Sequence, residues 1–214
     1  EELEGFWSAV AEFYAVRFAT PPERVLGRRE MPGAEWFPGA TLNYAEHVVG
    51  GPVDEVAVLA YSQTRERVEL TWEQLRDQVA RARAGLARLG VGRGDRVVAY
   101  LPNIPEALVA FLATASLGAI WASCAPEFGA RSVVDRFGQV EPTVLLAVAG
   151  YGYGSKEIDR REQVAEIRAG LPTVRHVVHV PYGPNTLPDA LGWAELLAEP
   201  DQLGFEAVPF AHPL

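Results

Sequence analysis

Cysteine is nearly absent from this sequence, where Cys124 stands alone. A lone cysteine cannot form an internal disulfide, which excludes the disulfide-stapled scaffolds of small secreted proteins. Cys124 lies in the apolar run AIWASCA, where a buried small side chain is a simpler interpretation than a reactive thiol. We therefore expect a cytoplasmic protein.

Positive charge is also scarce. The net charge is −9, and among the 19 basic residues only Lys156 is a lysine. Proteins that bind nucleic acid need a positive surface that displaces counterions from phosphates, so no nucleic-acid partner is expected. Small acidic ligands stay compatible with this charge, because a local site can be positive on an acidic protein.

A membrane-spanning segment is not expected either, although residues 107–125 carry no charge. Gly118 and several hydroxyl residues interrupt this run, and Pro105 and Pro126 lie just beyond its ends. Parallel-sheet proteins contain such continuous apolar runs. We interpret the segment as a buried helix, a glycine stop and a buried strand.

The rest of the composition is typical of a folded globular protein, with 49% hydrophobic and 22% charged residues. Residues 1–54 are rich in aromatic residues and proline, and residues 6–17 have the apolar spacing of a short amphipathic helix. We expect these residues to form an N-terminal extension packed on a larger body, residues 55–214. The expected aromatic anchors of the extension are Trp36, Phe37 and Tyr44.

From Glu55 onward, strand and helix patterns alternate at intervals of roughly 25 residues. Expected strands are the apolar or alternating runs at 56–62, 67–72, 96–101, 119–123, 143–149 and 176–182. Expected helices follow start and stop signals, among them a Thr71–Gln74 capping box, near 71–90, 105–117, 131–140, 158–169 and 193–197. The alternation implies right-handed crossovers and a sheet covered on both faces. The expected fold class is α/β, with a doubly wound, mainly parallel sheet.

The most conspicuous local feature is the glycine-rich run AGYGYGSKEID, residues 149–159, between an expected strand and an expected helix. Backbone amides at such a position can bind a phosphate. The run does not match the P-loop, because Ser155 replaces the second glycine and Glu157 follows Lys156. It does not match the dinucleotide fingerprint either, whose third glycine is also replaced by Ser155. We interpret it as either a flexible loop that contacts a ligand or an inert turn.

Other familiar reaction centres are missing from the sequence. The four histidines, His47, His176, His179 and His212, lack zinc-site spacing. No Gly-x-Ser-x-Gly nucleophile elbow occurs, and no carboxylate pair stands out. We therefore expect neither metal ligands nor catalytic residues here. The local motifs predict only an α/β domain of a nucleotide-binding or acyl-carrier type.

Several ordered motifs nevertheless resemble the N-terminal domain of the adenylate-forming enzyme superfamily. Between Leu70 and Leu146 the chain has a helix ending in LGVGRGDRV, then LPNIPEA, LGAIW and DRFGQVEPTVLL. WFPGATLNYAE, residues 36–46, is similar to a segment of short-chain acyl-CoA synthetases, with His47 where asparagine is usual. The runs FGARSVVDRFGQVEP at 128–142 and GYGYGSKEIDR at 150–160 are similar to acetoacetyl-CoA synthetases rather than to acetyl-CoA synthetases.

This resemblance implies the activation of acetoacetate by ATP to an acyl-adenylate, followed by attack of the coenzyme A thiol and release of AMP. It implies ATP and coenzyme A as cofactors, with Mg²⁺ bound through ATP by ligands outside these residues. The superfamily's phosphate loop and catalytic lysine are expected beyond Leu214, in the remainder of the same polypeptide, so this stretch alone is predicted to be inactive. An acetyl- or propionyl-type synthetase and a non-catalytic nucleotide- or partner-binding module stay open as alternatives.

The resemblance also implies a contact with coenzyme A. In related short-chain synthetases the segment matching Phe128 and Gly129 helps to hold the adenine end of coenzyme A. The loop matching residues 150–156 lies near the 3′-phosphate, which makes Lys156 the candidate positive residue. Plain core packing of Phe128 is the alternative.

Overall fold

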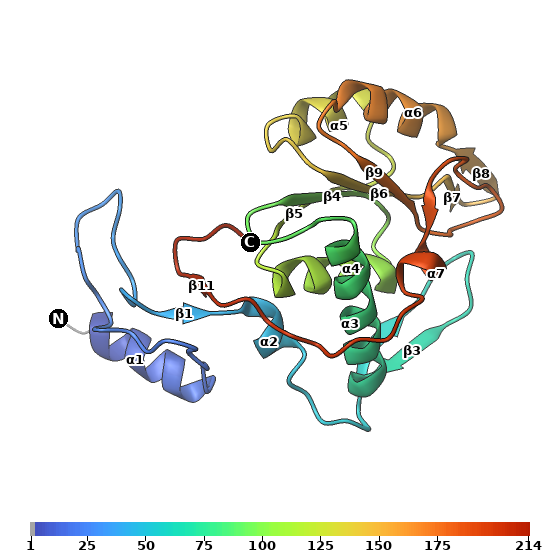
Figure 1. Cartoon of the computed structure of the whole chain (residues 1–214). Coiled ribbons are helices and arrows are strands. Elements are labelled where there is room, and N and C mark those ends of the chain that lie inside the picture. The colour runs from blue at the N-terminus through green and yellow to red at the C-terminus, as the bar shows by residue number, and fades with distance from the viewer. Residues whose placement is uncertain (1–2) are drawn as a thin grey trace.

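The computed structural model describes residues 3–214 and has a five-stranded parallel sheet at the centre of its larger body (Figure 1). The strands stand in the order β10-β9-β6-β4-β5. Their bounds are β4 Arg96–Tyr100, β5 Ile120–Cys124, β6 Val144–Ala147, β9 His176–His179 and β10 Leu191–Gly192. All neighbouring pairs in this sheet are parallel, which confirms the expected α/β class.

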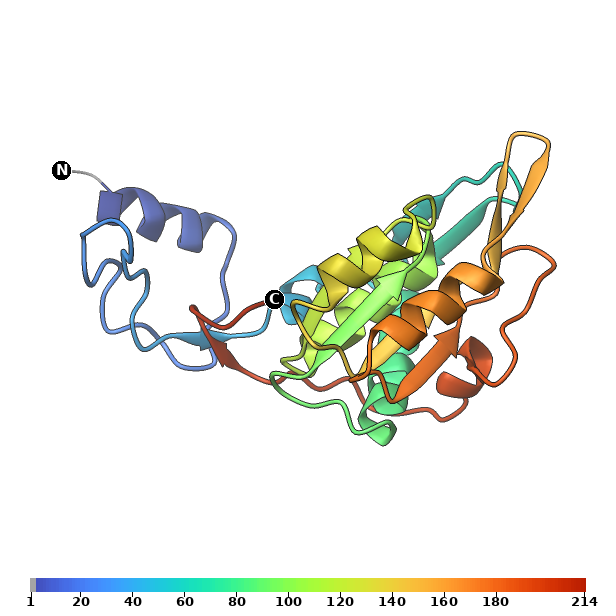
Figure 2. The same cartoon turned by 90° about the horizontal axis from the view of Figure 1, so that it is seen from above.

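Helices cover both faces of the sheet (Figures 1 and 2). One face carries α2 Tyr44–Val48, α3 Trp72–Arg88, α4 Pro105–Ser116 and α7 Trp193–Leu196. The other face carries α5 Ala130–Phe137 and α6 Arg161–Gly170. The chain passes from β4 to β5 through α4 and from β5 to β6 through α5, so these two crossovers lie on opposite faces.

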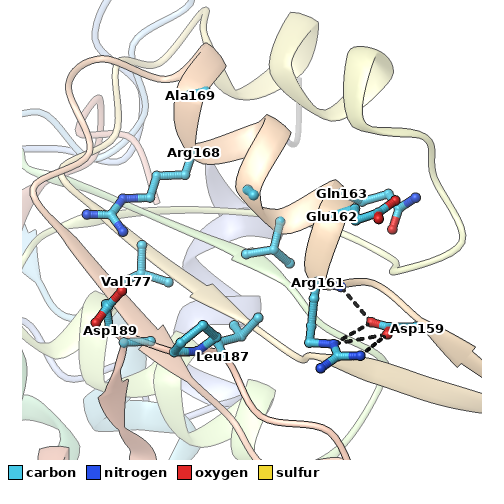
Figure 3. Close-up of a pocket in the computed structure, with 13 residues that line it drawn as sticks. Asp159, Arg161, Glu162, Gln163, Arg168, Ala169, Val177, Leu187 and Asp189 are labelled. Carbon is cyan, nitrogen blue, oxygen red and sulfur yellow. Dashed lines mark hydrogen bonds and ion pairs between the residues drawn. The ribbon is translucent and has the colours of Figure 1, made fainter.

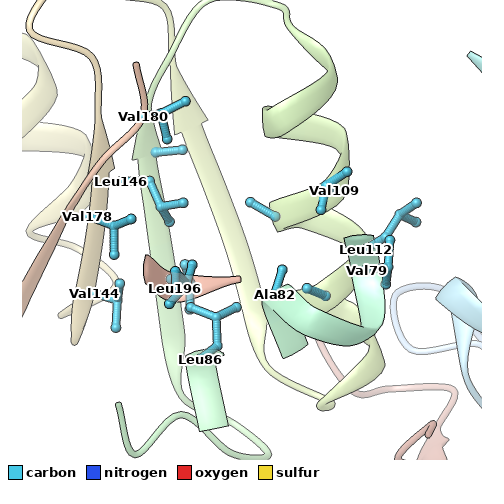
Figure 4. Packing of buried hydrophobic residues seen from close by; sticks show 14 of the residues in the cluster. Val79, Ala82, Leu86, Val109, Leu112, Val144, Leu146, Val178, Val180 and Leu196 are labelled. Atoms are coloured by element: carbon cyan, nitrogen blue, oxygen red, sulfur yellow. The ribbon is translucent and has the colours of Figure 1, made fainter. Parts of the chain in front are cut away.

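The central strands are buried on both sides because their side chains alternate between the two helical layers. In β4, Val97 and Ala99 pack with α3 and α4, whereas Val98 and Tyr100 pack with α5 and α6. Figure 4 shows the first of these cores, where Leu86 of α3 lies beside Leu196 of α7 and Leu112 of α4 lies beside Val79 of α3. Burial on both faces explains why these strands are continuous apolar runs in the sequence.

Helix α3 begins at the predicted capping box. The Thr71 hydroxyl accepts from the amide of Gln74 at 3.2 Å, and the Gln74 side chain accepts from the amide of Thr71 at 2.9 Å. One turn further on, the Arg76 guanidinium donates to the carbonyl oxygens of Val49 and Gly51, both at 2.9 Å. The start of α3 therefore fixes the segment that leads from α2 into the body.

Within residues 3–214, three antiparallel strand pairs lie outside this sheet. They are β2 Val56–Ala60 with β3 Val68–Thr71, β7 Gly150–Tyr153 with β8 Lys156–Asp159, and β1 Thr41–Leu42 with β11 Val208–Pro209. The β7–β8 pair corrects the sequence prediction: the glycine-rich run is a hairpin rather than a loop or turn, and the next helix begins at Arg161 instead of residue 158. Figure 2 shows this hairpin protruding from the body. Its first strand needs Gly150, because a Cβ there would lie 2.5 Å from the carbonyl oxygen of Ile158 on the facing strand.

The N-terminal segment lies to one side of the body (Figures 1 and 2). It begins with helix α1, Leu3–Phe13, which buries no residue. The Trp36 ring lies 5.7 Å from Trp7 of α1, within the same segment, and the Tyr44 ring lies 5.7 Å from Phe111 of α4. The amphipathic helix is confirmed in its first part and ends at Phe13 rather than at residue 17. The boundary at residue 54 stays a prediction.

Across residues 3–214, every helix is too short or too polar to cross a bilayer. The uncharged run at 107–125 is divided between α4 and β5, with the turn at Gly118 between them. This division confirms its interpretation as helix, glycine stop and strand.

Candidate functional site at the carboxyl edge of the sheet

The loops that follow the parallel strands meet at one edge of the sheet. Strands β4 and β6 are neighbours, but the chain leaves β4 toward α4 on one face and leaves β6 toward α6 on the other. In open α/β sheets such a topological switch point opens a crevice outside the carboxyl ends of the strands, where ligands bind. The candidate site is therefore this carboxyl edge, formed by residues 101–105, 125–129 and 148–160.

Tyr100 is the last residue of β4, and it is completely buried. Its hydroxyl donates to the carbonyl oxygens of Pro126 at 2.6 Å and Phe128 at 2.7 Å. Burial raises the pKa of Tyr100 to about 12, so the hydroxyl stays protonated at neutral pH and acts as a donor. The loop at 125–129 is thereby fixed to the central strand.

Phe128 and Gly129 lie where this loop enters α5. The Phe128 side chain is 39% exposed, so core packing does not explain it. The Arg136 guanidinium carbon lies 4.6 Å from the centroid of the Phe128 ring, a geometry typical of a cation–π contact. Gly129 caps α5 in an extended conformation, and no atom lies within 4 Å of the place its Cβ would take. The surface beside this glycine is open.

The base of the β7–β8 hairpin borders the same edge. The Arg160 guanidinium donates to the Tyr151 hydroxyl at 3.2 Å, and its central carbon lies 5.4 Å from the Tyr151 ring centroid. Burial raises the pKa of Tyr100, and the positive charge of Arg160 lowers it in part. Tyr151 and Glu127 raise it further. The hairpin base therefore acts electrostatically on the Tyr100 hydroxyl, which is hydrogen-bonded to the loop that carries Phe128.

Lys156 lies at the outer end of this hairpin. It is the first residue of β8, pairs with Tyr153 across the tip, and is exposed. The structure thus brings Phe128 and Gly129 to the carboxyl edge. Lys156 lies on the β7–β8 hairpin, which begins at the same edge but projects away from it.

The loop between β2 and β3 closes one side of the site. Its Arg65 donates to Glu106 at the start of α4 at 2.8 Å, and its guanidinium carbon lies 4.6 Å from the ring centroid of Tyr182. In the same loop, the Thr64 methyl group lies 2.4 Å from the place a Cβ on Gly152 would take. The loop therefore contacts the hairpin, the strand end after β9 and α4 together.

A second hollow lies beside α6, as Figure 3 shows. It is an open groove of about 930 Å³ between this helix and residues 187–190. At its mouth, the Arg161 side chain donates to the Asp159 carboxylate at 2.9 Å, and this hydrogen bond lowers the pKa of Asp159 to about 2. The walls carry charges of both signs, from Glu162 and Asp189 as well as Arg168. This mixture favours no single class of ligand, so we place the candidate site at the carboxyl edge.

Two chemically reactive side chains lie in the interior instead. Cys124 is buried, as expected, and His179 at the end of β9 is 8% exposed. Burial lowers the pKa of His179. Within residues 3–214, no three histidine, cysteine or carboxylate side chains gather where they could hold a metal ion.

Sequence reasoning missed four side chains of this edge: Tyr100, Arg136, Tyr151 and Arg160. Only Tyr100 had a usable signal, because a tyrosine in a buried apolar strand needs a partner for its hydroxyl. The pairs Phe128–Arg136 and Tyr151–Arg160 join residues eight and nine positions apart, and no periodicity of a single element predicts them.

A parallel sheet with helices on both faces and a topological switch point defines a doubly wound α/β domain. The family model described as "AMP-binding enzyme" matches residues 45–210, and the model described as "Acetyl-coenzyme A synthetase N-terminus" matches residues 1–48. The chain belongs to the AMP-binding enzyme family. The resemblance found in the sequence motifs is therefore confirmed.

Curated relatives include acetoacetyl-CoA synthetases of animals and bacteria. The chain is 36% identical to that of Macaca fascicularis over 100% of its length, and 37% identical to that of Mus musculus over 98%. It is 36% identical to the acetoacetyl-coenzyme A synthetase of Rhizobium meliloti over 100% of its length. It covers 34% of each of these relatives, so the chain spans about one third of their length.

The solved structures that share the fold include an acetoacetyl-CoA synthetase and a more distant acyl-CoA synthetase. The acetoacetyl-CoA synthetase from Streptomyces lividans is 56% identical, with a TM-score of 0.94 over 99% of this chain and 33% of that chain. An acyl-CoA synthetase from Brucella canis is 23% identical, with a TM-score of 0.67 over 80% of this chain and 30% of its own. The second likeness concerns the fold alone.

Proposed function

We propose that the protein containing this chain is an AMP-forming acetoacetate–CoA ligase. The observation that carries the proposal is the 56% identity to the Streptomyces lividans acetoacetyl-CoA synthetase, together with a TM-score of 0.94 over 99% of this chain. In this reaction ATP converts the acetoacetate carboxylate into an acyl-adenylate and pyrophosphate. The thiolate of coenzyme A then attacks the activated carbonyl and AMP leaves.

Within this proposal the carboxyl edge receives coenzyme A. Phe128 offers a partly exposed aromatic ring, already stacked by Arg136, on which an adenine ring can stack. Gly129 leaves open space beside it. Lys156 supplies a positive charge on the projecting hairpin, suited to the 3′-phosphate.

ATP and Mg²⁺ belong to the same proposal. The metal enters on the phosphates of ATP, and its ligands come from the part of the polypeptide outside these 214 residues. No residue of this chain is assigned to the metal or to the transfer of the adenylyl group. We also propose a cytoplasmic location for the enzyme.

The remainder of the polypeptide is the proposed partner of the exposed apolar surface near α1. A groove of about 320 Å³ lies between α1, the end of α4 and residues 208–214, and apolar side chains form most of its lining. Phe13 of α1 and Phe210 are largely exposed. Since the relatives are about three times as long, we propose that further parts of the same chain cover this surface.

A second candidate is an acetyl- or propionyl-type short-chain acyl-CoA synthetase. The match of residues 1–48 to the acetyl-coenzyme A synthetase N-terminus favours it. A non-catalytic nucleotide- or partner-binding module is the alternative from another class. Substrate choice discriminates the two synthetases, and any turnover excludes the module.

The test is AMP formation by the full-length protein with ATP, Mg²⁺ and coenzyme A, and with acetoacetate, acetate or propionate as the acid. We expect kcat/KM to be highest for acetoacetate. A preference for acetate or propionate would support the second candidate, and no turnover with any acid would support the module. The purified 214-residue chain should release no pyrophosphate above a no-enzyme control, because its sequence holds neither the phosphate loop nor the catalytic lysine of the superfamily.

A further inference from the structure

The side chain of Tyr100 joins the core of the sheet to its ligand edge. It ends β4, beside Cys124 of β5 and Ala147 of β6 in the parallel register. Its ring lies in the core formed with α5 and α6 and is completely buried. A phenylalanine would fill the same space, so the hydroxyl serves a purpose other than filling the core.

That hydroxyl has one hydrogen and two acceptors. The carbonyl oxygens of Pro126 and Phe128 lie at 2.6 and 2.7 Å from it, so the hydrogen is shared between two peptide groups of one short loop. Both contacts are shorter than the usual O–H···O separation of about 2.7–2.8 Å or equal to it. The backbone on each side of Glu127 is therefore held at a fixed depth over β4.

The hydrogen bonds from Tyr100 also determine the orientation of the Phe128 ring. Its carbonyl is bound by Tyr100 while its side chain stays 39% exposed under the Arg136 guanidinium. A loop anchored at its carbonyl oxygens keeps this ring turned toward solvent at the carboxyl edge.

We propose that Tyr100 is a positioning residue for coenzyme A, whose hydroxyl holds the Phe128 loop in the conformation that receives the adenine ring. This inference rests on the proposed function, because it takes the carboxyl edge as the coenzyme A side of the enzyme. Tyr100 itself touches no ligand. It acts through the backbone of residues 126–128.

The test compares Tyr100→Phe with the wild type in the full-length enzyme. We expect KM for coenzyme A to rise by roughly 3- to 10-fold, by analogy with the loss of a buried positioning hydrogen bond. KM for ATP should change by less than about 2-fold. Thr114→Val is the matched control, because it removes another buried hydroxyl that donates to a backbone carbonyl, that of Ala110 at 2.8 Å, near the end of α4 and away from the carboxyl edge. It should leave KM for coenzyme A unchanged.

A double-substitution cycle separates positioning from general loosening. If Tyr100 acts through the Phe128 ring, Tyr100→Phe should raise KM for coenzyme A little further in a Phe128→Ala background. Additive effects, or an equal rise of KM for coenzyme A and ATP, would overturn the proposal. An unchanged KM for coenzyme A would overturn it as well.

Hydrogen exchange gives a readout that does not depend on the substrate. The amides of residues 127–129 should exchange faster in ligand-free Tyr100→Phe than in the wild type, and unchanged exchange contradicts the anchor. If the wild type turns over none of the acids, the proposed function fails on that result alone. Faster exchange in the variant would then still establish the anchor, while the coenzyme A assignment would be withdrawn.

Discussion

The side-chain amide of Asn43 donates a hydrogen bond of 2.8 Å to the carbonyl oxygen of Ala115, 72 residues further along the chain. The same amide nitrogen donates at 2.8 Å to the carbonyl oxygen of Glu206, and the Asn43 side-chain oxygen accepts from the amide of Ala45 at 2.9 Å. With 1% of its surface exposed, Asn43 ties the start of α2 to the end of α4 and to the segment before β11.

Replacing Asn43 by alanine should therefore destabilise the protein. The carbonyl oxygens of Ala115 and Glu206 would each lose a hydrogen bond from Asn43, and the Ala45 amide would lose its helix cap. A hydrogen bond of this kind contributes about 0.5–1.5 kcal/mol. We expect Asn43→Ala to lower the free energy of unfolding by about 2–4 kcal/mol, measured by urea denaturation. Thr20→Ala, which removes an exposed hydrogen bond to Thr41 at 3.0 Å in the same region, should cost less than about 1 kcal/mol. Equal losses for the two variants would contradict this role of Asn43.

The Phe128–Arg136 contact gives a second prediction. Truncating the ring in Phe128→Ala should raise KM for coenzyme A by roughly 5- to 150-fold in the full-length enzyme, since stacking of a base on an aromatic ring is worth about 1–3 kcal/mol. Phe128→Trp keeps an aromatic face and should stay within about 3-fold of the wild type. The measurement is initial-rate kinetics with coenzyme A as the varied substrate. An equal rise for both variants would show that the size of the residue matters rather than stacking.

His179 predicts how stability depends on pH. Burial lowers the pKa of His179 in the folded protein below its ordinary value of 6.5, so below pH 6.5 the unfolded chain binds a proton that the folded chain resists. The contribution of His179 to the free energy of unfolding is fully present above pH 6.5. It is lost as the pH falls through the pKa of His179 in the folded protein. The advantage of the wild type over His179→Gln should therefore shrink as the pH is lowered from 7.5 to about 5, in urea denaturation at each pH. A constant difference across this range would exclude the mechanism, and His176→Gln, partly exposed on the same strand, is the matched control.

The sequence allowed the central sheet and its helices to be predicted because their signals are local. Apolar runs gave β4, β5, β6 and β9, and the Thr71–Gln74 capping box gave the start of α3. The β7–β8 hairpin was missed because glycines count against a strand. Here Gly150 is required by the close approach of the facing strand, a contact that only the fold reveals.

The candidate site was predicted less completely. Phe128 and Gly129 came from a family resemblance, and the structure places both at the carboxyl edge. The anchor on Tyr100 joins residues 26 and 28 positions apart, and the Asn43 contacts span still more of the chain. Such pairings depend on how the elements pack, and no local pattern encodes them.

Lys156 gives the last prediction. It is the chain's single lysine, and it is exposed on a hairpin whose base borders the proposed coenzyme A side. A solvent-exposed lysine–phosphate pair is a weak contact, so Lys156→Ala should raise KM for coenzyme A by only about 2- to 10-fold. Lys156→Arg keeps the charge and should stay close to the wild type, and the constants for ATP and acetoacetate should not change.

Dephospho-coenzyme A identifies the group that Lys156 binds. Without the 3′-phosphate the wild type should lose as much affinity as Lys156→Ala loses with coenzyme A, and the variant should lose nothing further, because either change removes one partner of the same pair. Both forms are compared through KM under identical salt, since an exposed ion pair is screened by it. If Lys156→Ala distinguishes coenzyme A from dephospho-coenzyme A as strongly as the wild type does, Lys156 binds no phosphate and is a solvated residue of the hairpin.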